Sequence, residues 1–201
     1  LYMAGPISAE YGKKFDAPEY LDLVVEQALL MEEKTRDKNT GLWYHAWDCS
    51  KKEGWADPVT GLSPEFWGRS IGWVPVAVLD DLDFLPEDHP GREGLRRLVR
   101  ELLQAVCHYQ SPEGMWYQVV DKADREENWP ETSCTCLFVA AICKAVREGI
   151  LPASFMEQAR KGYEAVIRHL GWEGENLLVQ GVCVGTGVGD YRHYCERPTS
   201  G

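Results

Sequence analysis

Residues 71–85 read IGWVPVAVLDDLDFL, and apolar side chains occupy most positions of this stretch. A helix that is apolar nearly all round has no face to present to water, and such helices are buried on all sides. We therefore predict that residues 71–85 form an inner helix of an all-α protein.

The helices predicted on either side of this stretch are amphipathic. Residues 18–37 and 90–110 repeat apolar side chains at helical spacing and carry charged side chains between them. The nearly apolar and the amphipathic patterns then alternate along the chain, which is typical of two concentric helical layers. Inner helices are predicted at 1–15, where Pro6 would kink or interrupt the helix, at 71–85 and at 132–146, and outer helices at 18–37, 90–110 and 152–170.

The loops that lead from an outer helix to the next inner helix also repeat. GLWYH at 41–45 recurs as GMWYQ at 114–118, and more faintly as NLLVQ at 176–180. Intervals of roughly 60 to 75 residues fit helical hairpins with long loops. We expect these loops to lie at one end of the helical layers and to form one cleft. Because three hairpins leave apolar flanks uncovered, the chain is predicted to be about half of a toroid.

The charge balance argues against nucleic acid as a partner. The chain has 21 Lys and Arg against 32 Asp and Glu, a net charge of −11, and it has no run of basic residues. No signal peptide or membrane span is visible, so we expect no membrane partner. The seven cysteines are an odd number without CxxC spacing, which indicates reduced thiols in the cytoplasm. We expect neither a metal site nor a cofactor.

An aromatic segment precedes the apolar helix. Residues 41–73 hold five of the eight tryptophans together with His45 and Arg69. Indole faces pack against the apolar faces of sugar rings, and a guanidinium pairs with a carboxylate through two parallel hydrogen bonds. The segment therefore predicts a pocket for a ring-shaped, anionic ligand.

Four motifs of the chain resemble glycoside hydrolase family 105, the unsaturated rhamnogalacturonyl hydrolases, and more distantly the unsaturated glucuronyl hydrolases of family 88. They are LWYHAWD at 42–48, FWGRSIGW at 66–73, ETS at 131–133 and GTGVGDY at 185–191. The resemblance runs from Leu1 to Thr199 and implies an (α/α)6 barrel of roughly twice this length. Residues 1–201 would then be a partial catalytic domain, truncated at both ends.

The resemblance also implies a reaction and a set of binding residues. Enzymes of this kind remove a 4,5-unsaturated galacturonic acid from pectin-derived oligosaccharides by hydrating the C4–C5 double bond, with an aspartate as general acid and base. That aspartate is expected just upstream of Leu1, so no catalytic residue is assigned in this chain. The unsaturated uronyl oligosaccharide would be bound by His45, Trp47, Trp67, Arg69, Trp73 and Met3.

Several alternatives stay open from the sequence. Asp48 and Glu131 are the best remaining carboxylates for acid or base chemistry, although acidic residues at such positions are usually caps. Arg69 beside Trp67 also fits a structural ion pair or cation–π contact. The chain would alternatively be a non-catalytic sugar-binding half-barrel or an inert fragment, or an epimerase or isomerase using His45 and His193. As half a toroid, the isolated chain is also expected to self-associate through its uncovered inner helices.

Overall fold

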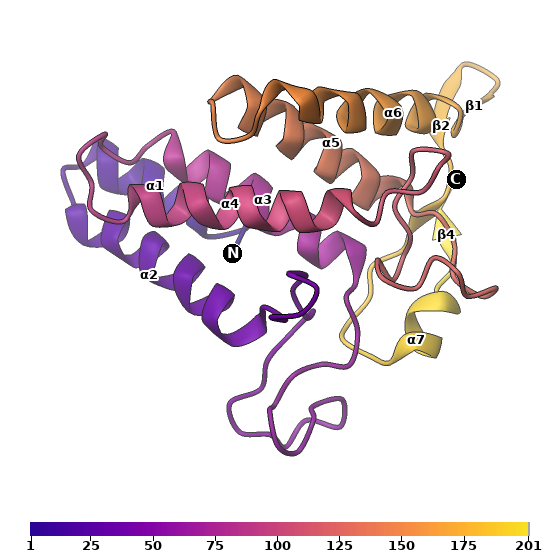
Figure 1. Ribbon diagram of the computed structural model, residues 1–201, viewed down its shortest axis with the longest axis horizontal. Coiled ribbons are helices and arrows are strands. Elements are labelled where there is room, and N and C mark those ends of the chain that lie inside the picture. Colours follow the sequence, from indigo (N-terminus) through magenta and orange to yellow (C-terminus); the bar gives the residue numbers. More distant parts are fainter. Residues whose placement is uncertain (201) are drawn as a thin grey trace.

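The computed structural model describes residues 1–200 and is largely helical, as predicted (Figure 1). Helices α1, α3 and α5 pack side by side in one layer, and α2, α4 and α6 cover them. Two small antiparallel sheets, β1 with β2 and β3 with β4, follow the last long helix. The helices are α1 (Gly5–Lys14), α2 (Pro18–Thr35), α3 (Gly68–Leu82), α4 (Arg92–Cys107), α5 (Thr132–Arg147), the 3-10 turn η1 (Ala153–Phe155), α6 (Met156–Ile167) and α7 (Tyr191–Cys195), and the strands are β1 (Leu170–Glu173), β2 (Asn176–Val179), β3 (Val182–Cys183) and β4 (Thr199–Ser200).

The first predicted helix is corrected in two respects. Pro6 does not interrupt α1, because it lies in the first turn, where a missing N–H costs nothing and the fixed φ favours helix. The helix is also not buried on all sides, since Ile7, Tyr11 and Phe15 are exposed. The buried residues of α1 are the small Gly5, Ala9 and Gly12, so most of the surface of its larger apolar side chains lies at the flank of this layer.

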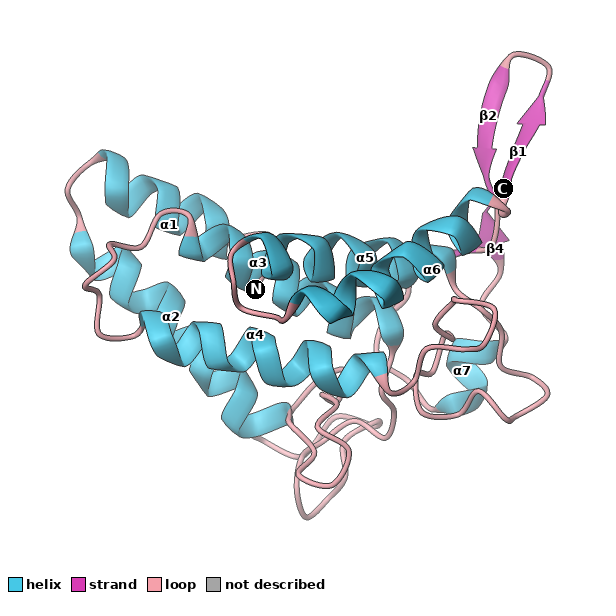
Figure 2. Ribbon diagram, turned by 45° about the horizontal axis from the view of Figure 1, so that its top comes forward, coloured by secondary structure: helices cyan, strands magenta, loops and turns pink. Residues whose placement is uncertain are grey.

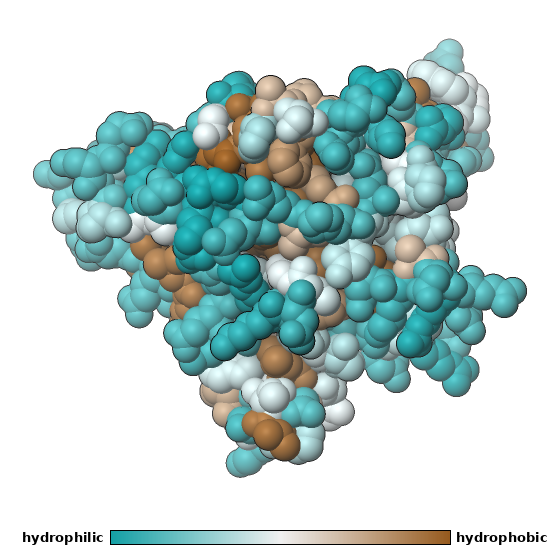
Figure 3. All heavy atoms as spheres, viewed as in Figure 1, coloured by the Kyte–Doolittle hydropathy of each residue, from teal (hydrophilic) through white to brown (hydrophobic). Residues whose placement is uncertain are grey.

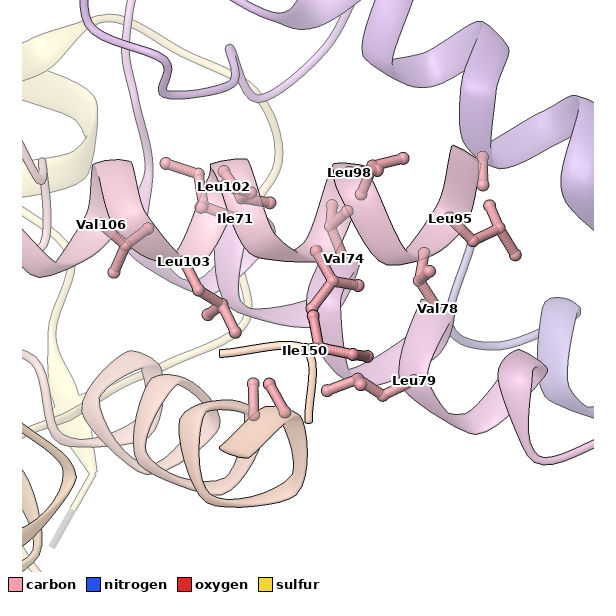
Figure 4. Close-up of a cluster of buried hydrophobic side chains, with 14 of the residues drawn as sticks. Ile71, Val74, Val78, Leu79, Leu95, Leu98, Leu102, Leu103, Val106 and Ile150 are labelled. Carbon is pink, nitrogen blue, oxygen red and sulfur yellow. The ribbon is translucent and has the colours of Figure 1, made fainter. Parts of the chain in front are cut away.

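The core lies between α3 and α4. Buried side chains of the two helices interdigitate, and Ile150 joins them from the turn after α5 (Figure 4). The apolar stripe predicted for residues 90–110 forms the α4 side of this contact, and the nearly apolar helix predicted at 71–85 forms the α3 side. The labelled members are Ile71, Val74, Val78, Leu79, Leu95, Leu98, Leu102, Leu103, Val106 and Ile150.

The predicted end of the last outer helix is wrong. α6 stops at Ile167, and the chain continues as a hairpin of β1 and β2, in which Leu170 pairs with Val179 and Trp172 with Leu177. This hairpin projects beyond the helical layers (Figure 2). The segment 176–180, interpreted from the sequence as a third copy of the loop motif, is therefore mostly strand.

The loops before α3 and α5 are joined by backbone hydrogen bonds at one end of the helices. Gly68 N donates to Gln118 O at 2.9 Å, and Val120 N donates to Phe66 O at 3.0 Å. Further along, Thr132 N donates to Gly181 O at 2.9 Å. These contacts bring together three segments that are far apart in the sequence, as the loop repeat predicts.

A buried carboxyl group lies between α1 and α3. Asp81 is fully buried, and neither of its carboxyl oxygens has a hydrogen-bond partner within residues 1–200. Its side chain faces Gly5 so closely that a Cβ there would lie 3.1 Å from Oδ1. Burial, reinforced by the neighbouring Asp80 carboxylate, raises the pKa of Asp81 from 3.8 to about 7.

Asp81 predicts an unusual pH dependence of stability. The folded chain holds the proton of the Asp81 carboxyl group more tightly than the unfolded chain does. The resulting contribution to the free energy of unfolding is complete below pH 3.8, and it is lost as the pH rises through about 7. At roughly 1.4 kcal/mol per pKa unit the loss amounts to at most about 4 kcal/mol. We expect Asp81→Asn to remove this slope in urea unfolding curves measured across that range.

The exposed Asp88 provides the matched control for this experiment. Asp88→Asn should leave the slope as in the unmodified chain, because an exposed carboxyl group has similar surroundings in the folded and unfolded states. An equal pH dependence in Asp81→Asn and the unmodified chain would contradict the assignment.

Candidate functional site

His45, Trp67 and Arg69 lie together, as the sequence predicts, and a fourth residue, Tyr194, completes the group. The ring centroids of His45 and Trp67 are 4.7 Å apart, and Trp67 stacks on Tyr194 at 5.7 Å with 14° between the planes. The Arg69 guanidinium lies 5.4 Å from the centre of the Trp67 ring. We call these four residues the His45 cluster.

The chain builds the cluster from three separate segments. His45 lies in the loop after α2, where its N–H donates to Glu65 O. Trp67 and Arg69 lie at the start of α3, which begins at Gly68, three residues before the predicted start at residue 71. Tyr194 belongs to the short helix α7, which Asp190 caps by accepting from His193 N.

Trp67 is held rigidly at the centre of the cluster. Its side chain is buried, and Nε1 donates to Gln118 Oε1 at 3.0 Å. The Gln118 amide in turn donates to Tyr194 O at 3.1 Å and to Cys183 Sγ at 3.0 Å. Sequence reasoning missed Gln118 as a site residue, although the loop repeat aligns it with His45.

Arg69 is anchored by a buried carboxylate. Its Nη2 donates to Glu131 Oε1 at 3.2 Å and to Cys183 O, and Nε donates to Ser133 Oγ at 2.8 Å. No hydrogen bond from Nη1 is found among residues 1–200, and the side chain keeps 15% of its surface exposed. Arg69 therefore has a structural ion pair and, at the same time, N–H groups left for a ligand.

The two candidate carboxylates for acid or base chemistry both have structural contacts. Glu131 is fully buried, and it caps α5 by accepting from Cys134 N at 2.6 Å. Asp48 accepts from the backbone N–H groups of Ser50, Lys52 and Glu53, and the bond from Glu53 contributes most to lowering its pKa to about 2. Both side chains organise the backbone, as the capping interpretation predicted.

His45 is neutral at physiological pH. Its burial, together with the nearby His193, lowers its pKa from 6.5 to about 4. Nδ1 lies 2.6 Å from the Tyr194 hydroxyl, whose oxygen also accepts from Gly189 N at 3.2 Å. The glycine loop at 185–189 thus contacts the cluster through its backbone.

Comparison with known proteins identifies the family. The model of glycosyl hydrolase family 88 matches residues 1–201. This chain belongs to glycosyl hydrolase family 88. A solved family 105 glycoside hydrolase from Clostridium acetobutylicum ATCC 824 is 33% identical with a TM-score of 0.93, over 99% of this chain and 58% of that one. A possible family 105 member from Salmonella enterica is 28% identical with a TM-score of 0.82, over 96% of this chain and 48% of its own.

Curated relatives agree with the family assignment. The protein Atu3128 of Agrobacterium fabrum is 33% identical over 92% of this chain and 79% of its own length. The unsaturated rhamnogalacturonyl hydrolase YesR of Bacillus subtilis is 27% identical over 62% of this chain and 34% of its own length. The resemblance noted in the sequence to families 105 and 88 is thereby confirmed.

The other three predicted binding residues of this family 88 chain are Trp47, Trp73 and Met3, and they do not belong to the His45 cluster. Trp47 Nε1 donates to Thr60 O at 3.0 Å in the long loop. Trp73 is 36% exposed and its ring lies 4.4 Å from that of Tyr2, while Met3 is 82% exposed. Their binding roles stay predictions.

A cavity of about 1060 Å³ lies away from the cluster, between the end of α3 and the start of α4. Its cations have structural partners, since Arg92 donates to Leu82 O and Leu85 O and Arg96 to Glu148 O. Within residues 1–200, no three His, Cys, Asp or Glu side chains are grouped closely enough to bind a metal ion. None of the helices in this range combines the length and the hydropathy that a membrane span requires.

Glu131 predicts a large stability effect. Glu131→Ala leaves the Arg69 guanidinium and two backbone N–H groups without their partner, so we expect a loss of about 3 to 5 kcal/mol in the free energy of unfolding. Urea denaturation followed by tryptophan fluorescence measures it. Glu157, which pairs with Arg160 on the exposed surface of α6, is the control, and Glu157→Ala should change little. Equal effects of the two substitutions would contradict the role of Glu131.

Proposed function

We propose that this chain is part of a glycoside hydrolase that acts on unsaturated uronyl oligosaccharides. The family 88 match over residues 1–201 carries the proposal. The His45 cluster supports it, because the buried ring of Trp67 lies between two hydrogen-bonding side chains, His45 and Arg69. His45 offers a neutral imidazole and Arg69 a cation, which suits a sugar hydroxyl and a carboxylate.

We also propose the narrower substrate that the resemblance implies, a 4,5-unsaturated galacturonic acid linked to rhamnose. The similarity to YesR, named an unsaturated rhamnogalacturonyl hydrolase, supports it. An Alteromonas relative named an unsaturated 3S-rhamnoglycuronyl hydrolase is 25% identical over 90% of this chain, so other uronyl linkages are the main rivals.

In the proposed reaction, water adds across the C4–C5 double bond. A proton goes to the alkene and the hydroxide to the neighbouring carbon, and the resulting hemiketal opens and releases the remaining saccharide. We assign the proton transfer to the aspartate that the resemblance places just before Leu1. Asp48 and Glu131 are fully engaged in backbone and ion-pair contacts, which supports leaving them out of the chemistry.

The chain would supply about half of an (α/α)6 catalytic domain. Residues 1–201 span 58% of the Clostridium chain and 48% of the Salmonella chain. In this proposal, further hairpins cover the flank of α1 and α2 and complete the cleft around the His45 cluster.

The test of the activity is the loss of absorbance of the conjugated alkene when the protein is incubated with an unsaturated rhamnogalacturonan disaccharide. Substrate binding is followed in parallel by quenching of tryptophan fluorescence. We expect His45→Ala to weaken binding or turnover roughly five- to twelvefold, since a hydrogen bond between uncharged groups in a buried site is worth about 1 to 1.5 kcal/mol.

The exposed His108 is the control for this substitution, and His108→Ala should leave both signals unchanged. Binding without turnover in every form of the protein would favour the non-catalytic sugar-binding alternative. A folded protein that neither binds nor hydrates any unsaturated uronide would overturn the proposal.

The exposed flank predicts self-association of the isolated chain. Ile7 and Tyr11 of α1 and Phe15 directly after it are exposed at helical spacing, and Leu23 and Leu30 of α2 are also exposed. Apolar patches interrupt the hydrophilic surface in the view of Figure 3. We expect sedimentation velocity to show mass increasing with concentration, and Ile7→Lys to reduce it.

Val59 provides the control, because it is 74% exposed but lies in the long loop before α3. Val59→Lys should leave the sedimentation behaviour unchanged. A monomer at all concentrations would contradict the prediction.

A further inference from the structure

The hydroxyl of Tyr194 is the least expected member of the His45 cluster. It is the only hydrogen-bond partner of the His45 side chain within residues 1–200, and it contacts Nδ1 at 2.6 Å. The Tyr194 side chain is fully buried, so water cannot replace a missing partner. The direction of this hydrogen bond therefore has to follow from the groups around it.

Two arrangements of the shared proton are conceivable. If Nδ1 of His45 carried the proton, the Tyr194 oxygen would accept both this N–H and the N–H of Gly189. The tyrosine O–H would then have no acceptor among the described residues, which costs about 1 to 3 kcal/mol for a buried donor. If the Tyr194 O–H donates to Nδ1, the hydroxyl proton, the hydroxyl oxygen and Nδ1 all have partners.

The second arrangement fixes the tautomer of His45. A neutral imidazole carries one proton, and when Nδ1 accepts a hydrogen bond the proton is on Nε2. Both groups stay in the required state near neutral pH, because burial raises the pKa of Tyr194 to about 12 and lowers that of His45 to about 4.

We propose that Tyr194 is a positioning residue that holds His45 as the neutral Nε2–H tautomer, so that the histidine presents a fixed, uncharged hydrogen-bond donor to the ligand. Tyr194 acts through His45 and makes no ligand contact in this proposal. The Gly189 N–H donates to the same oxygen, which couples the tautomer to the conformation of the glycine loop at 185–189. The ligand role of His45 rests on the proposed function, whereas the tautomer does not.

Other charged and titratable groups face this pair. His193, adjacent to Tyr194, donates to or accepts from Thr186 Oγ1 through Nε2 at 2.6 Å. Glu65 and Asp190 act on Tyr194 at longer range, and both disfavour its ionised form. None of them is hydrogen-bonded to the His45 ring, so the Tyr194 hydroxyl alone decides the tautomer.

The decisive measurement is the ¹⁵N chemical shift pattern of the His45 ring in the folded, ligand-free protein near pH 7. We expect the Nε2–H pattern with Nδ1 unprotonated, and a titration midpoint well below 6.5. In Tyr194→Phe the ring loses the donor to Nδ1, so we expect a mixture of tautomers and a higher midpoint.

Tyr191 is the matched control, because it lies on the same helix and its hydroxyl has no hydrogen-bond partner within residues 1–200. Tyr191→Phe should leave the His45 spectrum unchanged. A dominant Nδ1–H form in the unmodified protein, an unchanged tautomer in Tyr194→Phe, or equal shifts in the two variants would overturn the proposal.

The activity assay separates this inference from the proposed function. If His45 contacts the substrate, Tyr194→Phe should lower kcat/KM roughly five- to tenfold while Tyr191→Phe has no effect. If the protein does not act on unsaturated uronides but the spectra behave as expected, only the proposed function fails. If Tyr194→Phe gives a mixture of His45 tautomers but normal activity, the proposal that the Nε2–H of His45 donates to the ligand is overturned.

Discussion

The buried carboxylate of Glu131 holds together the segments on which the rest of the structure depends. It caps α5 through Cys134 N, binds Arg69 of α3 and accepts from Cys183 N of β3 at 2.9 Å. A buried carboxylate is tolerated only when its charge is paired and its lone pairs are satisfied. Its partners lie in α5, α3 and β3, so these three contacts fix the position of the two helices and the strand relative to one another. The loops that connect them are positioned as a result.

The long helices could be predicted because their information is local. The apolar stripe of α4 and the nearly apolar α3 and α5 are visible within single stretches of about 15 residues, which is the range over which helical periodicity acts. The buried Trp43 and Trp116 were likewise foreseeable from their repeat positions, and both are almost fully buried. The β1–β2 hairpin was not foreseeable in the same way, because five residues, 176–180, are too few for the sequence pattern to distinguish a strand from a copy of the loop motif.

The candidate site was only partly accessible to sequence reasoning. His45, Trp67 and Arg69 lie within one aromatic segment, so their proximity was predictable. Tyr194, by contrast, is 149 positions from His45, and Glu131 is 62 positions from Arg69. No periodicity or spacing rule relates residues at such distances, because the fold alone decides which of them meet. The sequence therefore indicates the candidate binding residues but not the residues that orient them.

The charge arrangement of the cluster bears on how an acidic chain can hold an acidic ligand. The net charge of −11 repels a carboxylate at long range, but solution ions screen charges beyond about 10 Å at ordinary ionic strength. At short range Glu131 largely neutralises Arg69, and His45 carries no charge. Attraction to a uronate would thus come from directed hydrogen bonds, by Arg69 Nη1 and by the imidazole, and not from a positive field. In the proposed function, such a site would recognise a carboxylate beside sugar hydroxyls by geometry, since donors held by Glu131 and Tyr194 cannot turn to follow an anion of another shape.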